Sequence, residues 1–302
     1  MSHAKAPNSP TIRAALWMIG SILAFSAMAI AAKQIGPRHD SFEIMTVRSA
    51  VGFVLVLALA AATGKLHEIT TRNLGGHAVR NVIHFTGQNL WFWALTMIPL
   101  AQLFAIEFTS PLWVVLLAAL LLGERLTKIR LIAAALGFVG VLIVARPDLA
   151  HLNPGVLAAA GSALCFATTN VVTKKLTQGL SILCILFWLT GMQFFFGLAA
   201  ALADGIFHLP TAATMPWLCV IGLAGVTAHY CITAALKLAP ASYVMPLDFL
   251  RLPLIAVVGA LIYAEPLDPY VILGAAVIFA GIWLNIRSEI RPKGHIAPIA
   301  PP

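Results

Sequence analysis

The sequence has few charged residues. Asp, Glu, Lys and Arg make up 10% of its 302 residues, and only 11 residues are acidic. Soluble domains carry about 25% charged residues, which cover much of their surface. The low charge excludes a soluble enzyme and a free nucleic-acid-binding protein. Together with a hydrophobic fraction of 60%, it predicts a polytopic integral membrane protein.

The sequence also lacks the motifs of common enzymes. It has no Gly-rich phosphate loop, no Cys-x-x-Cys pair, no His-Glu-x-x-His motif and no nucleophile elbow. Its four cysteines lie in apolar stretches without metal-like spacing, and we expect them to be small buried hydrophobic residues: Cys165, Cys184, Cys219 and Cys231. The sequence therefore favours neither a catalytic site of a common enzyme class nor a metal site.

Apolar segments of membrane-spanning length follow one another along nearly the whole chain. A bilayer core of ~30 Å needs about 20 apolar residues per helix. This criterion predicts an all-α membrane protein of ten transmembrane helices, at 14–34, 42–62, 77–96, 100–122, 129–145, 154–173, 182–203, 214–235, 241–263 and 269–286. The first apolar segment is too long for a signal-peptide core, so we expect it to be retained. Residues 1–13 are expected to be a short polar segment, and 288–302 a disordered tail.

The basic residues are distributed unequally between the two ends of these spans. With a cytoplasmic N-terminus, fourteen of them fall on the cytoplasmic side, three on the opposite side, and Arg48 and Arg251 within spans. Cytoplasmic loops of membrane proteins carry an excess of Lys and Arg. The distribution predicts an even number of spans, both termini in the cytoplasm, and a location in the inner (cytoplasmic) membrane of a bacterial-type cell.

The two halves of the chain resemble each other at one constant offset of 141 residues. The offset pairs residue types that apolar helices do not share by chance, namely Phe25 with Phe166, Lys33 with Lys174, Pro99 with Pro240, Glu124 with Glu265 and Gly140 with Gly281. It also pairs Glu107 with Asp248 and Gln88 with His229. The sequence therefore predicts two repeats, at 14–147 and 154–287.

Each predicted repeat contains five spans, so the second must enter the membrane from the side opposite to the first. Inverted-topology repeats are typical of secondary transporters, whose substrate site lies near the midplane between the halves. Two similar halves that face opposite ways provide two packings of nearly equal energy, each open to one side. Exchange between these packings would carry a substrate across the membrane.

The ends of the fourth and ninth spans carry recurrent motifs. One is Pro99-Leu100-Ala101, followed by Phe108-Thr109-Ser110-Pro111 and Leu122-Gly123-Glu124-Arg125, and the other is Ala239-Pro240-Ala241, followed by Pro253 and Ala264-Glu265-Pro266. In these motifs and in its ten-helix pattern, the chain resembles the EamA-type transporters of the drug/metabolite transporter superfamily. The resemblance covers residues 12–288, although Ala264 replaces the expected Gly. It implies a central cavity lined by the first four helices of each half, and no cofactor.

Four charged residues fall near the middle of predicted spans: Arg48, Glu107, Asp248 and Arg251. A charge at the bilayer centre costs at least ~2.5–3.5 kcal/mol on insertion scales, so each needs a partner or a function. Prolines near both acids bend the helix axis and free backbone groups, which favours a cavity wall. The alternative is structural, because Asp248 and Arg251 lie at i,i+3 and can form an ion pair.

Uncharged polar and aromatic residues accompany these charges. The third and eighth spans contribute His84, Gln88, Trp91, His229 and Tyr230, and the sixth contributes Asn170. These side chains could bind a substrate, or they could hold helices together through hydrogen bonds. Glu124 and Glu265 lie at helix ends instead, and we expect them to be structural caps.

The leading hypothesis is a secondary carrier of a small organic metabolite that works by alternating access. Two acids and two arginines at similar depth favour a zwitterionic or cationic substrate, such as an amino acid or an S-adenosylmethionine-like compound. A membrane-embedded enzyme and a channel are the alternatives. The expected partners are this substrate and the lipid bilayer, with no nucleic acid. Coupling to protons, exchange and the formation of a homodimer are left open by the sequence.

Overall fold

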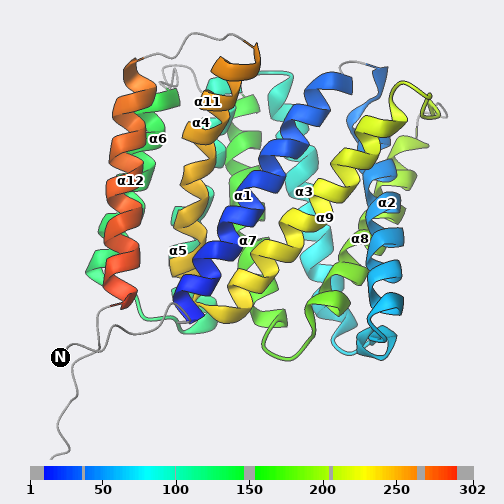
Figure 1. The fold of residues 1–302 in the computed structure, drawn as a ribbon, viewed down its shortest axis with the longest axis horizontal. Helices are drawn as coiled ribbons and strands as arrows, with labels where there is room; N and C mark the ends of the chain where they lie inside the picture. The colour runs from blue at the N-terminus through cyan, green and yellow to red at the C-terminus, as the bar shows by residue number, and fades with distance from the viewer. Residues whose placement is uncertain are drawn as a thin grey trace, which may run out of the picture.

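Long helices run roughly side by side through the molecule (Figure 1). The computed structural model describes residues 10–35, 38–98, 100–145, 154–203, 207–263 and 269–290. The first half contains α1 (Pro10–Ile35), α2 (Ser41–Ala62), η2 (Leu66–Glu68), α3 (Leu74–Leu95), α4 (Leu100–Glu107), α5 (Ser110–Leu122) and α6 (Lys128–Ala145). The second contains α7 (Pro154–Leu176), α8 (Ile182–Ala201), α9 (Met215–Leu238), α10 (Ala241–Val244), η3 (Met245–Leu250), α11 (Arg251–Tyr263) and α12 (Pro269–Ile290). With α4–α5 and α10–η3–α11 each counted as one broken rod, the described residues form the ten predicted spans.

Eight of the described segments are long and apolar enough to cross a membrane. The other two rods are α3 and α6. Helix α3 is less apolar because it contains several polar residues. These side chains are buried inside the protein: His77, Arg80, Asn81, His84 and Gln88. A helix that turns polar residues to the bundle interior keeps them away from lipid.

The predicted repeat is visible in the helix boundaries. Five pairs of elements begin 141 residues apart, namely α2 and α8, α3 and α9, α4 and α10, α5 and α11, and α6 and α12. With five rods in each half, equivalent helices of the two halves run in opposite directions. The fold is thus an all-α membrane protein built from two inverted five-helix repeats, as the sequence predicted.

The two halves interlock across the molecule. Helix α1 packs along α9, and their repeat counterparts α7 and α3 pack together in the same way. Helices α2 and α8 pack against each other, as do α6 and α12, which form one side of the bundle in Figure 1. The helices that carry the candidate site residues therefore meet partners from the opposite half.

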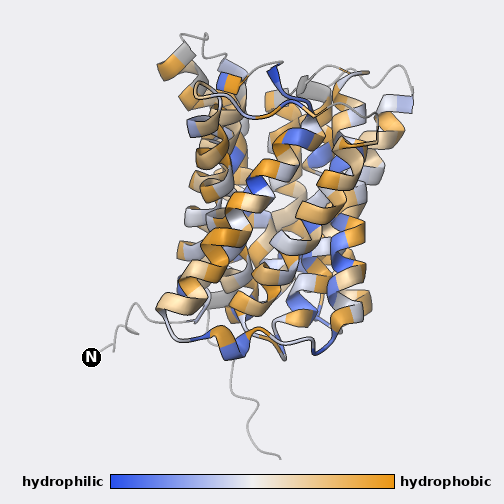
Figure 2. Cartoon of the chain, turned by 90° about the vertical axis from the view of Figure 1, so that its right-hand side faces the viewer, coloured by the Kyte–Doolittle hydropathy of each residue, from blue (hydrophilic) through white to orange (hydrophobic). Residues whose placement is uncertain are grey.

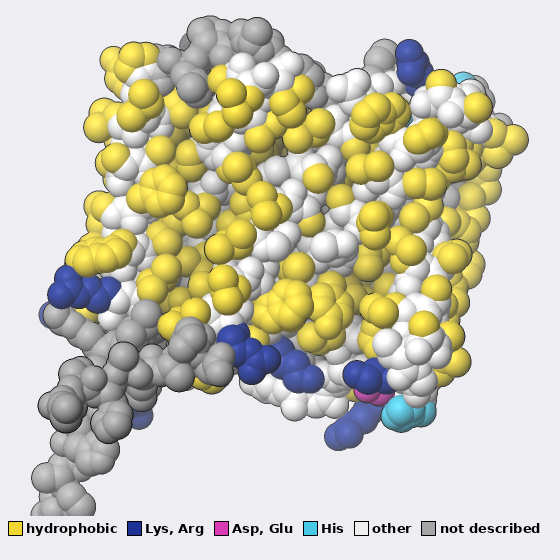
Figure 3. Space-filling view, viewed as in Figure 1, with side chains coloured by type: hydrophobic (Ala, Val, Ile, Leu, Met, Phe, Trp, Pro, Cys, Tyr) yellow, Lys and Arg dark blue, Asp and Glu magenta, His cyan; other side chains and the backbone are white. Residues whose placement is uncertain are grey.

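The surface separates into an apolar girdle and charged ends. Hydrophobic residues predominate along the helices (Figure 2), and Lys and Arg side chains gather along the lower edge of the face shown in Figure 3. We call this the lower end, and it is the end at which α1 begins in Figure 1. Leu120 and Leu261 are about four-fifths exposed, which suits contact with lipid.

Two of the predicted spans consist of more than one helical segment in the structure. The span predicted at 100–122 divides after Glu107, and Pro111 occupies the first turn of α5. The span predicted at 241–263 contains the 3-10 segment η3, with Pro246 in its first turn. Proline has no backbone N–H to donate and its ring clashes with the preceding turn. The sequence predicted bends at these prolines, and the structure shows that the two helices break there.

Smaller boundaries also differ from the predictions. Helix α1 already begins at Pro10, inside the segment predicted as a polar terminus, and α12 continues to Ile290, three residues into the predicted tail. A search for apolar runs does not detect helix ends that contain polar residues. Cys219 is exposed on α9 and Cys165 is half-buried on α7, which contradicts the prediction that all four cysteines are buried, because an apolar stretch in a membrane has a lipid-facing side.

Glu124 caps a helix of the opposite half at the lower end, as predicted. Its carboxylate accepts hydrogen bonds from the backbone N–H groups of Ala241 and Ser242, at 2.8 and 3.0 Å, and from the Ser242 hydroxyl at 2.6 Å. Arg130 donates to the same hydroxyl at 2.9 Å. These contacts fasten the first turn of α10 to the loop after α5. Glu265, the repeat counterpart of Glu124, lies outside the described residues.

Candidate functional site

A charged cluster lies where the two broken rods meet. Glu107 is the last residue of α4, Asp248 lies in η3, and Arg251 is the first residue of α11. Nη2 of Arg251 donates to Oε1 of Glu107 and to Oδ2 of Asp248, each at 3.0 Å. One guanidinium thus binds the two acids that the repeat offset pairs, and the predicted i,i+3 ion pair is confirmed.

Aromatic side chains surround this cluster. The indole Nε1 of Trp91, on α3, donates to Oε2 of Glu107 at 2.7 Å. The guanidinium carbon of Arg251 lies 5.1 Å from the ring centroid of Phe108 and 5.5 Å from that of Phe25. Stacking of this kind stabilises a cation where little water is present.

The cluster is partly accessible and incompletely paired. The side chains of Glu107, Asp248 and Arg251 are 13–16% exposed. Oδ1 of Asp248 and Nε of Arg251 are buried with no hydrogen-bond partner. With both acids ionised, the three side chains carry a formal charge of −1. The cluster can therefore offer a further hydrogen bond and a net negative charge to a ligand.

A second cluster brings together two histidines from opposite halves. The rings of His84, on α3, and His229, on α9, pack edge to face with centroids 5.4 Å apart. Phe166 of α7 packs against His84 at 5.8 Å, and Phe25 of α1 packs against His229 at 5.6 Å. Each phenylalanine thus contacts the histidine of the opposite half, so four helices converge on this point.

The histidine cluster also contains polar atoms without partners. Both ring nitrogens of His84 and Oε1 of Gln88 are buried and have no hydrogen-bond partner. These side chains lie four residues apart on one face of α3. Phe25 contacts both His229 and Arg251, so it connects the histidine cluster to the charged cluster.

Two of the other predicted site residues lie on helices next to these clusters. Arg48, on α2, is half-buried, and its Nη1 lies 3.7 Å from the sulfur of Met28, one turn after Phe25 on α1. Asn170 is half-buried on α7, one turn after Phe166. Asn170 therefore shares a face of α7 with Phe166, and Arg48 contacts the face of α1 that carries Phe25 and Met28.

Tyr230 lies on a neighbouring face of α9 from His229. It packs edge to face with Trp17 at 5.6 Å. It also lines a pocket of about 530 Å³ near the lower end, together with Lys65, Glu68 and Lys237. The sequence grouped Tyr230 with His229 because the two residues are adjacent. Side chains of adjacent residues on a helix point about 100° apart, so the two do not share a face.

Sequence reasoning missed the three phenylalanines of the site. Phe25, Phe108 and Phe166 looked like ordinary apolar residues of membrane helices. The repeat contained a usable signal, because Phe25 and Phe166 are equivalent at the offset of 141. Rings at matched positions occupy equivalent places in the two halves.

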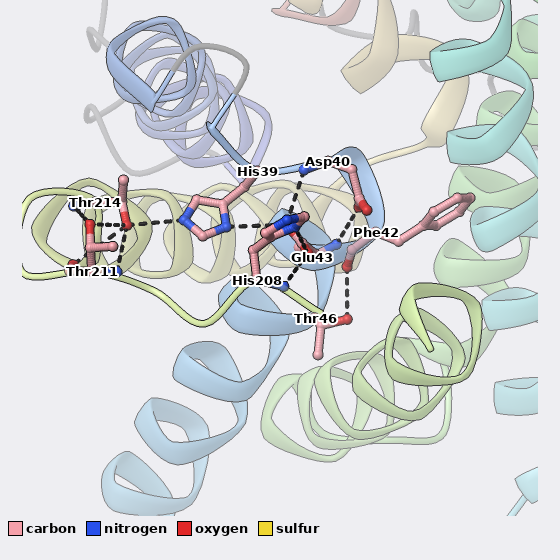
Figure 4. A network of polar contacts seen from close by, with 8 residues as sticks. All are labelled: His39, Asp40, Phe42, Glu43, Thr46, His208, Thr211 and Thr214. Carbon is pink, nitrogen blue, oxygen red and sulfur yellow. Dashed lines mark hydrogen bonds and ion pairs between the residues drawn. The ribbon is translucent and has the colours of Figure 1, made fainter. Parts of the chain in front are cut away.

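A buried acid at the upper end was also missed. Glu43, in the first turn of α2, is 1% exposed and contacts Nδ1 of His39 at 3.1 Å and Nδ1 of His208 at 2.8 Å (Figure 4). Nε2 of His39 lies 3.0 Å from the Thr214 hydroxyl. Asp40 caps the same helix. The network ties the start of α2 to the loop that precedes α9, and we interpret it as structural.

The family comparison covers both halves of the chain. The model of the EamA-like transporter family matches residues 12–146 and again 153–287. A protein named riboflavin transporter from Rhizobium johnstonii is 31% identical over 285 residues, which cover 94% of each chain. A protein named S-adenosylmethionine uptake transporter from Rickettsia prowazekii is 25% identical over 90% of this chain and 92% of its own.

A solved structure shares the architecture. One crystal structure superposes with a TM-score of 0.79 at 18% identity, and the match covers 92% of this chain and 99% of the other. At this identity the likeness concerns the fold alone. The family match and the two named relatives indicate a membrane transporter of small metabolites rather than an enzyme. The chain belongs to the EamA-like transporter family.

Proposed function

We propose that the protein is a secondary active transporter that moves a small organic metabolite by alternating access. The observation that carries this proposal is the ion-pair cluster of Glu107, Asp248 and Arg251, to which both inverted halves contribute. It lies at the breaks of two helices, where freed backbone groups are tolerated only beside protein or a cavity. Broken helices between inverted repeats form the substrate sites of many secondary transporters.

The charges support a substrate with a zwitterionic or cationic polar part, such as an amino acid or an S-adenosylmethionine-like compound. The formal charge of −1 on the cluster attracts a cationic group, and the unpaired Oδ1 of Asp248 can accept its hydrogen bond. Arg48 lies close to α1 and could bind a carboxylate. The names of the relatives add riboflavin and S-adenosylmethionine as candidates.

Counterflow into proteoliposomes tests the proposal. Vesicles loaded with one unlabelled candidate should accumulate the same labelled compound transiently, and the rate should saturate. We expect Glu107→Gln and Asp248→Asn to reduce the rate at least tenfold. Glu68→Gln is the matched control, because Glu68 pairs only loosely with Lys65, at 4.0 Å near the surface. Full transport activity in both acid variants would contradict the proposal that the cluster binds substrate.

The driving force can be measured in the same vesicles. A pH gradient that accelerates net uptake would identify proton coupling, whereas uptake that requires an internal substrate would identify exchange. Ion-like rates without saturation would identify a channel instead.

We further propose that the lower end faces the cytoplasm in an inner membrane. The Lys and Arg side chains along this end support that orientation (Figure 3). A fluorescent protein fused after Pro302 should fluoresce, and alkaline phosphatase fused after Asp148 should be active. The reverse pattern would invert the assignment.

A further inference from the structure

We propose that the cluster of His84, His229, Phe25 and Phe166, with Gln88, binds a planar heteroaromatic ring of the substrate. The charged cluster then binds the polar part of the same molecule. This inference rests on the proposed transport function and narrows its substrate class to ring-bearing metabolites of the flavin or adenosine type.

The first argument is the arrangement of the rings. Four aromatic side chains come from α1, α3, α7 and α9, with neighbouring centroids 5.4–5.8 Å apart. Two of these three contacts are edge to face, which leaves ring faces available for stacking with another planar group. Phe25, Phe166 and His229 are only half-buried, so part of each remains accessible.

The second argument is the set of unpartnered polar atoms. His84 is 7% exposed and Gln88 is 8% exposed, yet both nitrogens of His84 and Oε1 of Gln88 have no hydrogen-bond partner. Buried polar groups are costly unless they are hydrogen-bonded. One nitrogen of a neutral imidazole donates and the other accepts, and the amide oxygen accepts. Together these atoms match the edge of a heteroaromatic ring, which carries both donors and acceptors.

The third argument is the connection to the charged cluster. Phe25 packs against His229 and also lies under the guanidinium of Arg251. A ligand that stacks beside Phe25 therefore reaches Arg251, Glu107 and Asp248 with a side chain. A ring-free amino acid would fill the charged cluster and leave His84 and Gln88 unpaired.

A competition experiment on the purified full chain tests whether the two clusters bind different parts of one substrate. The probes are riboflavin and S-adenosylmethionine, which have a ring and a polar part; lumichrome and adenine, which are rings alone; and ribitol and methionine, which lack such a ring. Binding is followed by the quenching of flavin fluorescence and by thermal shift. We expect lumichrome or adenine to bind, and ribitol and methionine to bind at least tenfold more weakly than the matching complete molecule.

Variants separate the two parts of the site. His84→Phe keeps a ring and removes its nitrogens, and Gln88→Leu removes the amide, so each should weaken the ring-only probe at least tenfold. Glu107→Gln should weaken the complete molecule but not the ring alone. Asn89→Ala is the control, because Asn89 donates to the Phe85 carbonyl of its own helix. His84→Asn, which retains polar atoms, should recover part of the affinity.

The outcomes distinguish this inference from the transport proposal. If ring-free compounds bind and are transported while ring compounds do not compete, the ring site is overturned and the transporter stands. If folded His84→Phe and Gln88→Leu variants bind ring compounds like the unaltered protein, the inference is also wrong. If ring compounds bind at His84 but no compound shows counterflow, the transport proposal fails and the ring site is retained.

Discussion

Arg251 of the second half donates to Glu107 of the first half at 3.0 Å, so an ion pair joins the halves at their broken helices. The repeat does not reproduce this contact. Position 110, which corresponds to Arg251 at the offset of 141, is Ser110, whose buried hydroxyl has no partner. In the alternating-access cycle that we propose, the two conformations would therefore be electrostatically unequal, because a mirrored ion pair cannot form.

Removal of Arg251 should damage both stability and transport. In Arg251→Gln, Glu107 and Asp248 lose their shared cation. Removal of one partner from a fully buried ion pair costs about 3–5 kcal/mol, which is an upper limit for this partly accessible cluster. We expect a lower melting temperature in detergent and at least a tenfold loss of counterflow. The double variant Glu107→Gln/Arg251→Gln should regain much of the stability without regaining transport. Equal melting temperatures for the single variant and the unaltered protein would contradict the ion pair.

Trp91→Phe should lower stability and weaken substrate binding. The change removes the 2.7 Å hydrogen bond to Oε2 of Glu107 and keeps an aromatic ring. A hydrogen bond to a charged group contributes about 1.5–3 kcal/mol to stability, so the melting temperature in detergent should fall. Because Glu107 loses a group that orients its carboxylate, saturation of counterflow should also require several-fold more substrate. Trp93→Phe, at an exposed position two residues away, is the control and should leave the half-saturation concentration unchanged.

Glu124 and Ser242 should be energetically coupled. Their side chains are 2.6 Å apart, and Glu124 also accepts two backbone N–H groups at the start of α10. Glu124→Gln and Ser242→Ala should each lower stability, and the double variant should be less damaging than the sum. Residues that share a hydrogen-bond network show coupling of about 0.5–3 kcal/mol. Strictly additive unfolding free energies in a double-mutant cycle would show that the contact contributes nothing.

Glu43 should contribute more to stability than His208, the exposed histidine that contacts it. Glu43→Ala leaves buried His39 without its carboxylate and should lower the melting temperature clearly. His208→Ala should matter less, because the His208 side chain is 66% exposed and water competes for its hydrogen bonds. His67→Ala, at the repeat-equivalent position in the first half, is the control. A larger loss in His208→Ala than in Glu43→Ala would show that the loop before α9, rather than the acid, holds this end together.

Much of the architecture could be predicted from local patterns. Apolar runs located the ten spans, and matched residues such as Glu107 and Asp248 revealed the repeat. The helix breaks were predicted only as bends, because proline shows that a helix is perturbed but not whether the chain continues as a 3-10 segment, as it does at Met245–Leu250. The buried network of Glu43 was not predicted, since His208 lies 165 residues away in a loop.

The sequence by itself determined the membrane class, the two inverted repeats and the set of polar residues that must avoid lipid, because hydropathy and repetition are properties of the chain order. Only the tertiary structure decided that Arg251 binds both repeat-equivalent acids and that Phe25 links them to His84 and His229. These contacts depend on the packing angle and rotation of helices from opposite halves. His229 and Tyr230 are adjacent on α9, so their side chains point about 100° apart and only His229 faces the site. The packing of α9 against neighbouring helices decides which of the two does so.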